Sequence, residues 1–285
     1  KRFALVLLAV VVLGVGAFAI RFLNAEGPVV ISETKKTTSK VRTLGVSVED
    51  RRIDAYTFGN GATHLTFIGG MHGGYEWNSV ILAQTFIEYL RAHPEFVPKD
   101  IRITVIPNAN PDGVFAVVGK EGIFTADDVL TGEGATDKGR FNARGVDLNR
   151  NFDCKWQPTG TWRSRIVSGG TEPFSEPEAK TVRDFALGEK PDVVVFWHSQ
   201  SNAVYASECE EGILPETLAL MNTYAKAAEY RGIAAFEAYE VHGDAEGWLA
   251  SIGIPALTVE LSTHQSIDWE KNLAGITALI NHFNK

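Results

Sequence analysis

Short apolar runs rich in branched residues alternate along the chain with longer stretches in which apolar residues recur every three or four positions. The short runs predict β-strands, and the longer stretches predict amphipathic helices. We expect strands at residues 43–48, 53–58, 65–68, 101–106, 193–197 and 256–261, and helices at residues 79–91, 176–187, 217–230 and 268–283. Strands that alternate with helices form a sheet covered on both faces. The pattern therefore predicts a single α/β domain over residues 43–285, with a mixed, mainly parallel β-sheet and a hairpin at one edge.

The first part of the chain has a different pattern, because residues 3–20 are uncharged and almost all apolar. Lys1 and Arg2 precede this run and Arg21 ends it, so it predicts a hydrophobic helix that is either a cleaved signal peptide or an uncleaved signal anchor within residues 1–26. Residues 27–42 are polar and are expected to form a linker. Either interpretation predicts an extracytoplasmic protein, which is secreted or is anchored to the membrane by its N-terminal segment.

Composition narrows the class of protein. With 285 residues and 45% apolar content, the chain can bury a large core. The formal net charge of −8 argues against nucleic acid as a partner, since a binder of nucleic acid needs a basic face. Only two cysteines occur, which excludes a disulfide scaffold and a cysteine-rich metal module.

Unusual polar residues follow the predicted strands, at the edge where open α/β sheets bind ligands. His72 and Glu76 come after one strand and His198 follows another. Two imidazoles and a carboxylate form a ligand set for a catalytic zinc ion with one open position. Glu260, near the end of a further strand, is the candidate general base. For each of these residues taken alone, a structural role is the alternative.

Five segments occur in one order along the chain: HGGYEW, NPDG, GVDLNRNFD, FWHS and TVEL. This order resembles the zinc carboxypeptidase family of carboxypeptidases A and B, and it is most similar to bacterial members without a long propeptide. The resemblance extends from about residue 43 to the C-terminus. It implies one Zn²⁺ per chain, with His72, Glu76 and His198 as ligands and Glu260 as general base and proton shuttle.

The same resemblance implies roles for residues of the central motifs. Asn149 and Arg150 would bind the terminal carboxylate of the substrate, and Asp147 would accept the second ring N–H of His72. An arginine before this motif would polarise the scissile carbonyl. Arg140 fits that position best, and Arg144 is the alternative.

The segment before Glu260 matches the family with one residue fewer. The match places Tyr239 where the family has a substrate-capping tyrosine, and Glu246 near the position that sets side-chain preference. An acid there would favour a basic group, such as lysine, arginine or the amine end of diaminopimelate, and the alternative is a solvated acidic loop.

One departure from the family pattern affects the metal site. Three residues separate His72 from Glu76, where the family usually has two. Two of the three are glycines, which can absorb an extra residue in a turn. Glu76 is therefore retained as a ligand.

Cys154 and Cys209 each follow a site motif by a few residues, and in an exported chain they are expected to form a disulfide. Together these features predict an extracytoplasmic zinc metallocarboxypeptidase acting on peptide or cell-wall peptide substrates. The alternatives are a peptidoglycan stem-peptide peptidase that cleaves the γ-D-glutamyl–diaminopimelate bond, an N-acyl amino-acid deacylase, and a catalytically silent peptide-binding module.

Overall fold

An eight-stranded sheet runs through the protein in the order β1-β2-β4-β3-β7-β12-β8-β11. The computed structural model describes residues 39–236 and 239–284. The sheet strands are β1 (Lys40–Val46), β2 (Arg52–Gly59), β3 (Thr63–Ile68), β4 (Ile101–Ile106), β7 (Val193–Ser199), β8 (Ala203–Ala206), β11 (Arg231–Ile233) and β12 (Ala256–Leu261). The α-helices are α1 (Trp77–Ala92), α2 (Pro111–Val118), α3 (Pro177–Glu189), α4 (Pro215–Ala227), α5 (Ala245–Ser251) and α6 (Trp269–Phe283).

The sheet is mixed, with a parallel centre. Strands β4, β3, β7 and β12 pair in parallel, whereas β1, β2 and β8 pair antiparallel with their neighbours toward β4 or β12. The edge hairpin expected from the first two apolar runs is β1 and β2. The predicted fold class, a single α/β domain with a mixed sheet, is confirmed.

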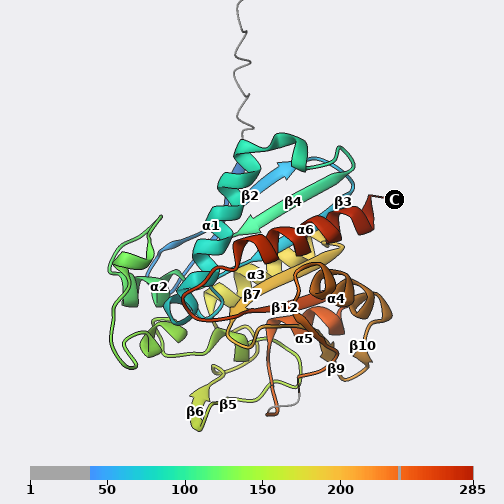
Figure 1. Ribbon diagram of the computed structural model, residues 1–285. Helices are drawn as coiled ribbons and strands as arrows, with labels where there is room; N and C mark the ends of the chain where they lie inside the picture. The colour runs from blue at the N-terminus through green and yellow to red at the C-terminus, as the bar shows by residue number, and fades with distance from the viewer. Residues whose placement is uncertain (1–38, 237–238, 285) are drawn as a thin grey trace, which may run out of the picture. The chain divides into compact units, whose positions relative to one another are not determined.

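The side chains of β7 alternate between the two faces of the sheet, and each face has its own hydrophobic core. Val193, Val195 and Trp197 belong to the cluster that packs against α1, α4 and α6. Val194 and Phe196 belong to the cluster that packs against α3 and α5. Figure 1 shows α1 and α6 in front of the sheet and α3 behind it. All seven residues of β7 are buried, so this strand holds its last side chains in fixed positions.

The short elements around the strand ends were not predicted. Helix α2 begins with Pro111, and the Asn110 side chain caps it by accepting a hydrogen bond from the Gly113 N–H at 2.9 Å. The same Asn-Pro-Asp-Gly letters are typical of a turn, which hides the helix start. A small hairpin of β5 (Thr159–Trp162) and β6 (Arg165–Ser168) and the pair β9 (Glu208–Cys209) and β10 (Gly212–Ile213) also form.

The predicted boundary of the linker differs from the structure. Strand β1 begins at Lys40, so residues 40–42 belong to the sheet because they pair with β2. The predicted signal segment at residues 1–26 and most of the linker lie outside the described residues. Among the described helices, none has the length and apolar character needed to cross a membrane.

Candidate active site

The turn after β3 carries His72 and Glu76 and is shaped by close backbone packing. Residues Gly73–Glu76 form a 3-10 helix, and Gly73 has a left-handed φ of 45°. A Cβ atom at Gly73 would lie 2.5 Å from the carbonyl oxygen of Gly139, and one at Gly74 would lie 2.7 Å from that of Gly113. Only glycine allows this approach. The extra residue between His72 and Glu76 is thus accommodated in a 3-10 turn.

Three side chains converge at this point. Oε1 of Glu76 lies 2.8 Å from Nδ1 of His72, and its Oε2 lies 2.9 Å from Nδ1 of His198, at the end of β7. The two Nδ1 atoms are 3.2 Å apart. All three residues are buried, and their ligand atoms lie within 4.8 Å of one another. Zinc–nitrogen bonds of about 2.0 Å in a tetrahedral site place ligand atoms about 3.3 Å apart, so this donor set fits a zinc ion.

The electrostatics of the cluster favour an ionised carboxylate. Burial alone would raise the pKa of Glu76, but the neighbouring His72 and His198 outweigh burial and hold this pKa well below its usual range. Burial likewise opposes protonation of His198, whereas the charges of Glu76 and Glu246 raise its pKa well above the usual value. Negative charge therefore surrounds the two imidazoles, as a cation would require.

Glu260 lies beside this cluster. It is paired with His198 in the register of β12 against β7, so the two side chains leave the same face of the sheet. Its Oε2 atom is buried and has no hydrogen-bond partner among the described residues. Burial, together with repulsion from Glu76, raises the pKa of Glu260 to about 8. A carboxylate with an unsatisfied oxygen beside the donor set can hold and transfer a proton there.

Asp147 connects the donor set to Arg140. Its Oδ2 accepts a 2.8 Å hydrogen bond from Nε of Arg140, and its Oδ1 lies 3.5 Å from Nε2 of His72. The second distance is too long for a strong hydrogen bond, although the two groups face each other. Burial would raise the pKa of Asp147, but the Arg140 guanidinium and His72 hold it far below its ordinary range.

The two candidate arginines, Arg140 and Arg144, lie in different surroundings. Arg140 is 3% exposed and lines the cleft that contains His72 and Glu260. Arg144 has a side chain that is 56% exposed, and it pairs with Glu176 away from that cleft. The position of Arg140 fits the role of polarising a substrate carbonyl.

Asn149 and Arg150 belong to a 3-10 helix, Leu148–Arg150, and line the same cleft. The Asn149 Oδ1 atom accepts a 2.9 Å hydrogen bond from the backbone N–H of Ala245. Arg150 donates to the carbonyls of Asn149 at 2.6 Å and Thr161 at 3.2 Å, and its buried Nε has no partner among the described residues. These backbone contacts orient the guanidinium without neutralising it, so it can bind a carboxylate.

Glu246 has a contact that its sequence position did not indicate. It is 3% exposed at the start of α5, and its Oε1 lies 3.0 Å from Nε2 of His198 and 3.2 Å from the hydroxyl of Thr258. Its other oxygen is buried without a partner among the described residues. The expected side-chain preference stays a prediction, and the structure adds a second role, which is to orient His198.

The remaining predicted residues border the same region. Tyr239 is 37% exposed on the cleft rim and packs edge to face against Phe236. Cys154 and Cys209 form a disulfide, as expected, and Cys154 lines the cleft. The cleft has a volume of about 550 Å³.

Sequence reasoning gave no role to several side chains of the cleft wall, among them Trp162, Arg163 and His264. Trp162 and Arg163 come from the β5 end of the small hairpin, and His264 follows β12. No motif marks them, and the only sequence signal was that His264 follows a strand that ends in the base.

Comparison with known proteins decides the family. A family model described as zinc carboxypeptidase matches residues 30–277. The chain belongs to the zinc carboxypeptidase family. The predicted resemblance is confirmed, and so is the interpretation of the chain as a zinc metallopeptidase at the level of the family.

Curated relatives of this member of the zinc carboxypeptidase family bear the names of different activities. Gamma-D-glutamyl-L-diamino acid endopeptidase 1 of Lysinibacillus sphaericus is 25% identical over 244 residues, covering 77% of this chain and 60% of the relative. Carboxypeptidase B of Astacus astacus is 27% identical over 250 residues, covering 84% of this chain and 76% of the relative. The chain thus spans less than two thirds of the endopeptidase.

Solved structures confirm the fold. Bovine thrombin-activatable fibrinolysis inhibitor matches with a TM-score of 0.68 at 19% identity, over 86% of this chain and 90% of that chain. The murein-tripeptide amidase of Escherichia coli O157 matches with a TM-score of 0.60 at 22% identity, over 87% of this chain and 98% of that chain. At these identities the likeness concerns the fold alone.

Proposed function

We propose that this protein is a zinc-dependent metallocarboxypeptidase that hydrolyses the peptide bond before a C-terminal residue with a free carboxylate. The observation that carries the proposal is the convergence of His72, Glu76 and His198 beside Glu260, in one cleft with Arg150. Neither a silent binding module nor a structural histidine pair requires a buried, unsatisfied glutamate oxygen at this place.

Each part of the reaction is assigned to particular side chains. A zinc ion held by His72, Glu76 and His198 would polarise the scissile carbonyl and make a water molecule more acidic. Arg140 donates hydrogen bonds to the carbonyl oxygen as negative charge develops on it. Glu260 takes the proton from the attacking water and then delivers it to the nitrogen of the leaving amine.

Arg150 and Asn149 hold the free carboxylate of the substrate at a fixed distance from the reacting carbonyl. A planar guanidinium binds a carboxylate through two parallel hydrogen bonds, which orients the substrate as well as attracting it. Binding energy from this remote group is therefore used to position the scissile bond. A peptide with an amidated end cannot accept this pair of bonds.

The acids near Arg150 support a preference for a basic terminal residue. Asp244 caps α5 by accepting from the Gly247 N–H at 2.7 Å, and burial together with Glu246 raises the pKa of Asp244 to about 6. The unpartnered oxygen of Glu246 is available to a substrate ammonium group. Lysine, arginine and the amine end of diaminopimelate all supply such a cation.

A second candidate is a peptidase of cell-wall stem peptides that cleaves between γ-D-glutamate and diaminopimelate. It is supported by the similarity to the Lysinibacillus endopeptidase over 77% of this chain. Diaminopimelate also carries both a carboxylate that Arg150 can bind and an amine that Asp244 and Glu246 can bind. N-acyl amino-acid deacylation needs the same donor set, but no feature of the described cleft favours it.

We also propose that the enzyme acts outside the cytoplasm, secreted or anchored by its N-terminal segment. Two features support this location: the apolar run at residues 3–20 and the disulfide between Cys154 and Cys209. Fractionation of the cells that produce the protein tests the location. Digests with and without reductant then detect the disulfide, and sequencing of the N-terminus shows whether the leader is cleaved. A protein recovered only in the cytoplasm would contradict it.

A pair of substrates tests the proposed activity. A blocked dipeptide that ends in lysine is compared with the same dipeptide carrying a C-terminal amide, and a stem tripeptide is included. We expect hydrolysis of the free acid and little hydrolysis of the amide. Equal hydrolysis of acid and amide would contradict anchoring by Arg150, and hydrolysis of none of the three would contradict the activity.

A further inference from the structure

Arg163 occupies the turn between β5 and β6 and lines the catalytic cleft. One of its nitrogens, Nη2, donates a 2.8 Å hydrogen bond to the Tyr75 hydroxyl. Its guanidinium carbon lies 5.2 Å from the ring centroid of Trp162 and 5.6 Å from that of Tyr75. Tyr75 is itself the residue before the predicted ligand Glu76, so this hydrogen bond holds the exposed residue Arg163 against the turn that carries the donor set.

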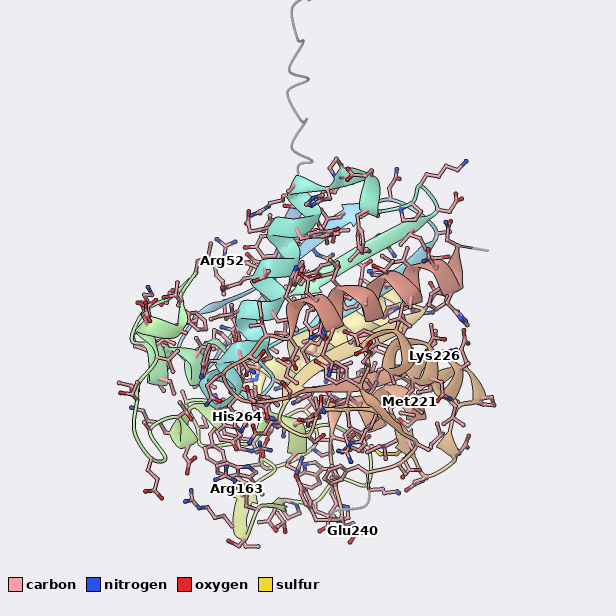
Figure 2. All side chains as sticks on the ribbon, viewed as in Figure 1. Arg52, Arg163, Met221, Lys226, Glu240 and His264 are labelled. Carbon is pink, nitrogen blue, oxygen red and sulfur yellow. A yellow bond between two sulfur atoms is a disulfide. The ribbon has the colours of Figure 1, made fainter. Side chains whose placement is uncertain are left out.

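Arg150 and Arg163 both approach the β5 hairpin, since Arg150 donates to the carbonyl of Thr161, but only Arg163 also borders a second hollow. Tyr75, Arg163 and His264 border both the catalytic cleft and a neighbouring hollow, whereas Asn149 and Arg150 border the cleft alone. In Figure 2 the labelled Arg163 lies below His264, and Glu240 lies to the right of both. The Arg140 guanidinium lies 5.8 Å from the ring centroid of Tyr75, so an acyl part that extends from Arg150 past Arg140 would reach Tyr75 and Arg163.

The charge of Arg163 is not neutralised within the part of the chain that the structure describes. Arg140 pairs with Asp147 and Arg165 pairs with Asp137, but no carboxylate of the described residues lies within 4.0 Å of Arg163. A guanidinium has five N–H donors, and the Tyr75 hydroxyl uses one of them. The remaining donors suit a carboxylate of the substrate.

We propose that Arg163 is a specificity-determining residue that selects substrates with a carboxylate on the acyl side of the scissile bond. A γ-linked glutamyl peptide is the substrate class that fits, because its free α-carboxylate is separated from the scissile carbonyl by only three carbon atoms. An α-linked peptide of neutral residues has no charge at this place. The proposal rests on the proposed peptidase function, and it favours the stem-peptide alternative over general C-terminal trimming.

Two substrates that differ in a single group test this proposal. One is N-acetyl-γ-D-glutamyl-L-lysine, and the other is 4-acetamidobutyryl-L-lysine, which lacks only the α-carboxylate. For the zinc-loaded wild-type enzyme we expect kcat/KM to be roughly tenfold or more higher for the glutamyl substrate, as is typical of a charged hydrogen bond. Arg163→Gln should bring the ratio close to one. Arg165→Gln, a matched arginine on the same hairpin with a side chain 61% exposed, should keep the wild-type ratio.

A wild-type ratio near one, or a ratio that Arg163→Gln leaves intact, would overturn the role of Arg163. If neither substrate is hydrolysed, the proposed activity is wrong. The affinities of the same two compounds, measured by calorimetry, then test the role of Arg163 separately. Tighter binding of the glutamyl compound that Arg163→Gln abolishes supports the proposal. Equal binding of both compounds by the wild-type protein refutes it.

Discussion

One carboxylate oxygen of Glu246 lies 3.0 Å from Nε2 of His198, on the side of the imidazole opposite the predicted metal ligand atom Nδ1. The carboxylate therefore fixes both the orientation of the ring and the nitrogen that carries its proton. This contact joins α5 to the end of β7, two elements that are separated by about fifty residues. The acid that the sequence suggested for substrate preference is thus also tied to the donor set.

Glu246→Gln should weaken zinc binding by about 10–100-fold, because an amide makes the imidazole a less basic ligand than a carboxylate does. The measurement is competition between the protein and a chromogenic chelator. The same variant should reduce any preference for lysine over phenylalanine at the substrate terminus. Glu240→Gln is the matched control, since Glu240 is an acid that lines the same cleft and has a side chain 81% exposed. Unchanged zinc affinity in Glu246→Gln would show that the contact does not tune the site.

Arg140 and Arg144 should differ strongly in their effect on catalysis. Replacing Arg140 by glutamine removes the donor that faces the developing negative charge, and we expect kcat to fall by about 10²–10³-fold. Arg144→Gln should leave kcat within about twofold, since its side chain is 56% exposed and pairs with Glu176. Steady-state kinetics of both variants, with thermal unfolding as a check on folding, provide the comparison. The reverse order of effects would assign the carbonyl-polarising role to Arg144.

Because His64 is buried, we expect it to lower the free energy of unfolding as the pH becomes mildly acidic. It is buried at the start of β3, where Nδ1 lies 3.0 Å from the Arg102 guanidinium and Nε2 lies 2.8 Å from the Thr104 hydroxyl. Burial, followed by repulsion from Arg102, lowers the pKa of His64 to about 4. The unfolded chain therefore binds a proton near pH 6.5, whereas the folded protein resists protonation until about pH 4.

The contribution of His64 to the free energy of unfolding is fully present above pH 6.5 and is lost as the pH falls toward 4. We expect a loss of about 1–3 kcal/mol across this interval relative to His64→Gln, which does not titrate. Urea unfolding at pH 7, 5.5 and 4.5 measures the difference between the two proteins. Parallel pH profiles for wild type and variant would contradict this account.

The strand ends were predictable because strong local patterns mark them. Buried runs such as residues 193–197 are typical of central strands. His198 directly follows this run and Glu260 lies near the end of β12, so their convergence follows from the parallel pairing of β7 with β12. Glu76 could be retained as a ligand despite the extra residue because Gly73 and Gly74 permit a tight turn. In these cases the local sequence carries the information that places the side chain.

Other parts of the site depend on contacts between distant segments, which no local pattern encodes. The pairing of Glu246 with His198 requires α5 to pack against the end of β7. Arg163 reaches Tyr75 only through a short hairpin of two four-residue strands, which carry no strong strand pattern. The start of α2 was missed because its capping residues are also turn residues.

The most direct test of the central claim is a zinc titration of metal-free protein, with hydrolysis of a blocked dipeptide ending in lysine measured at each addition. We predict that activity is absent after chelation, rises linearly and reaches its plateau at one zinc per chain. Glu260→Gln should bind one zinc with similar affinity and regain less than about a thousandth of the wild-type rate. Hydrolysis that persists without metal, or full activity of zinc-loaded Glu260→Gln, would contradict the account.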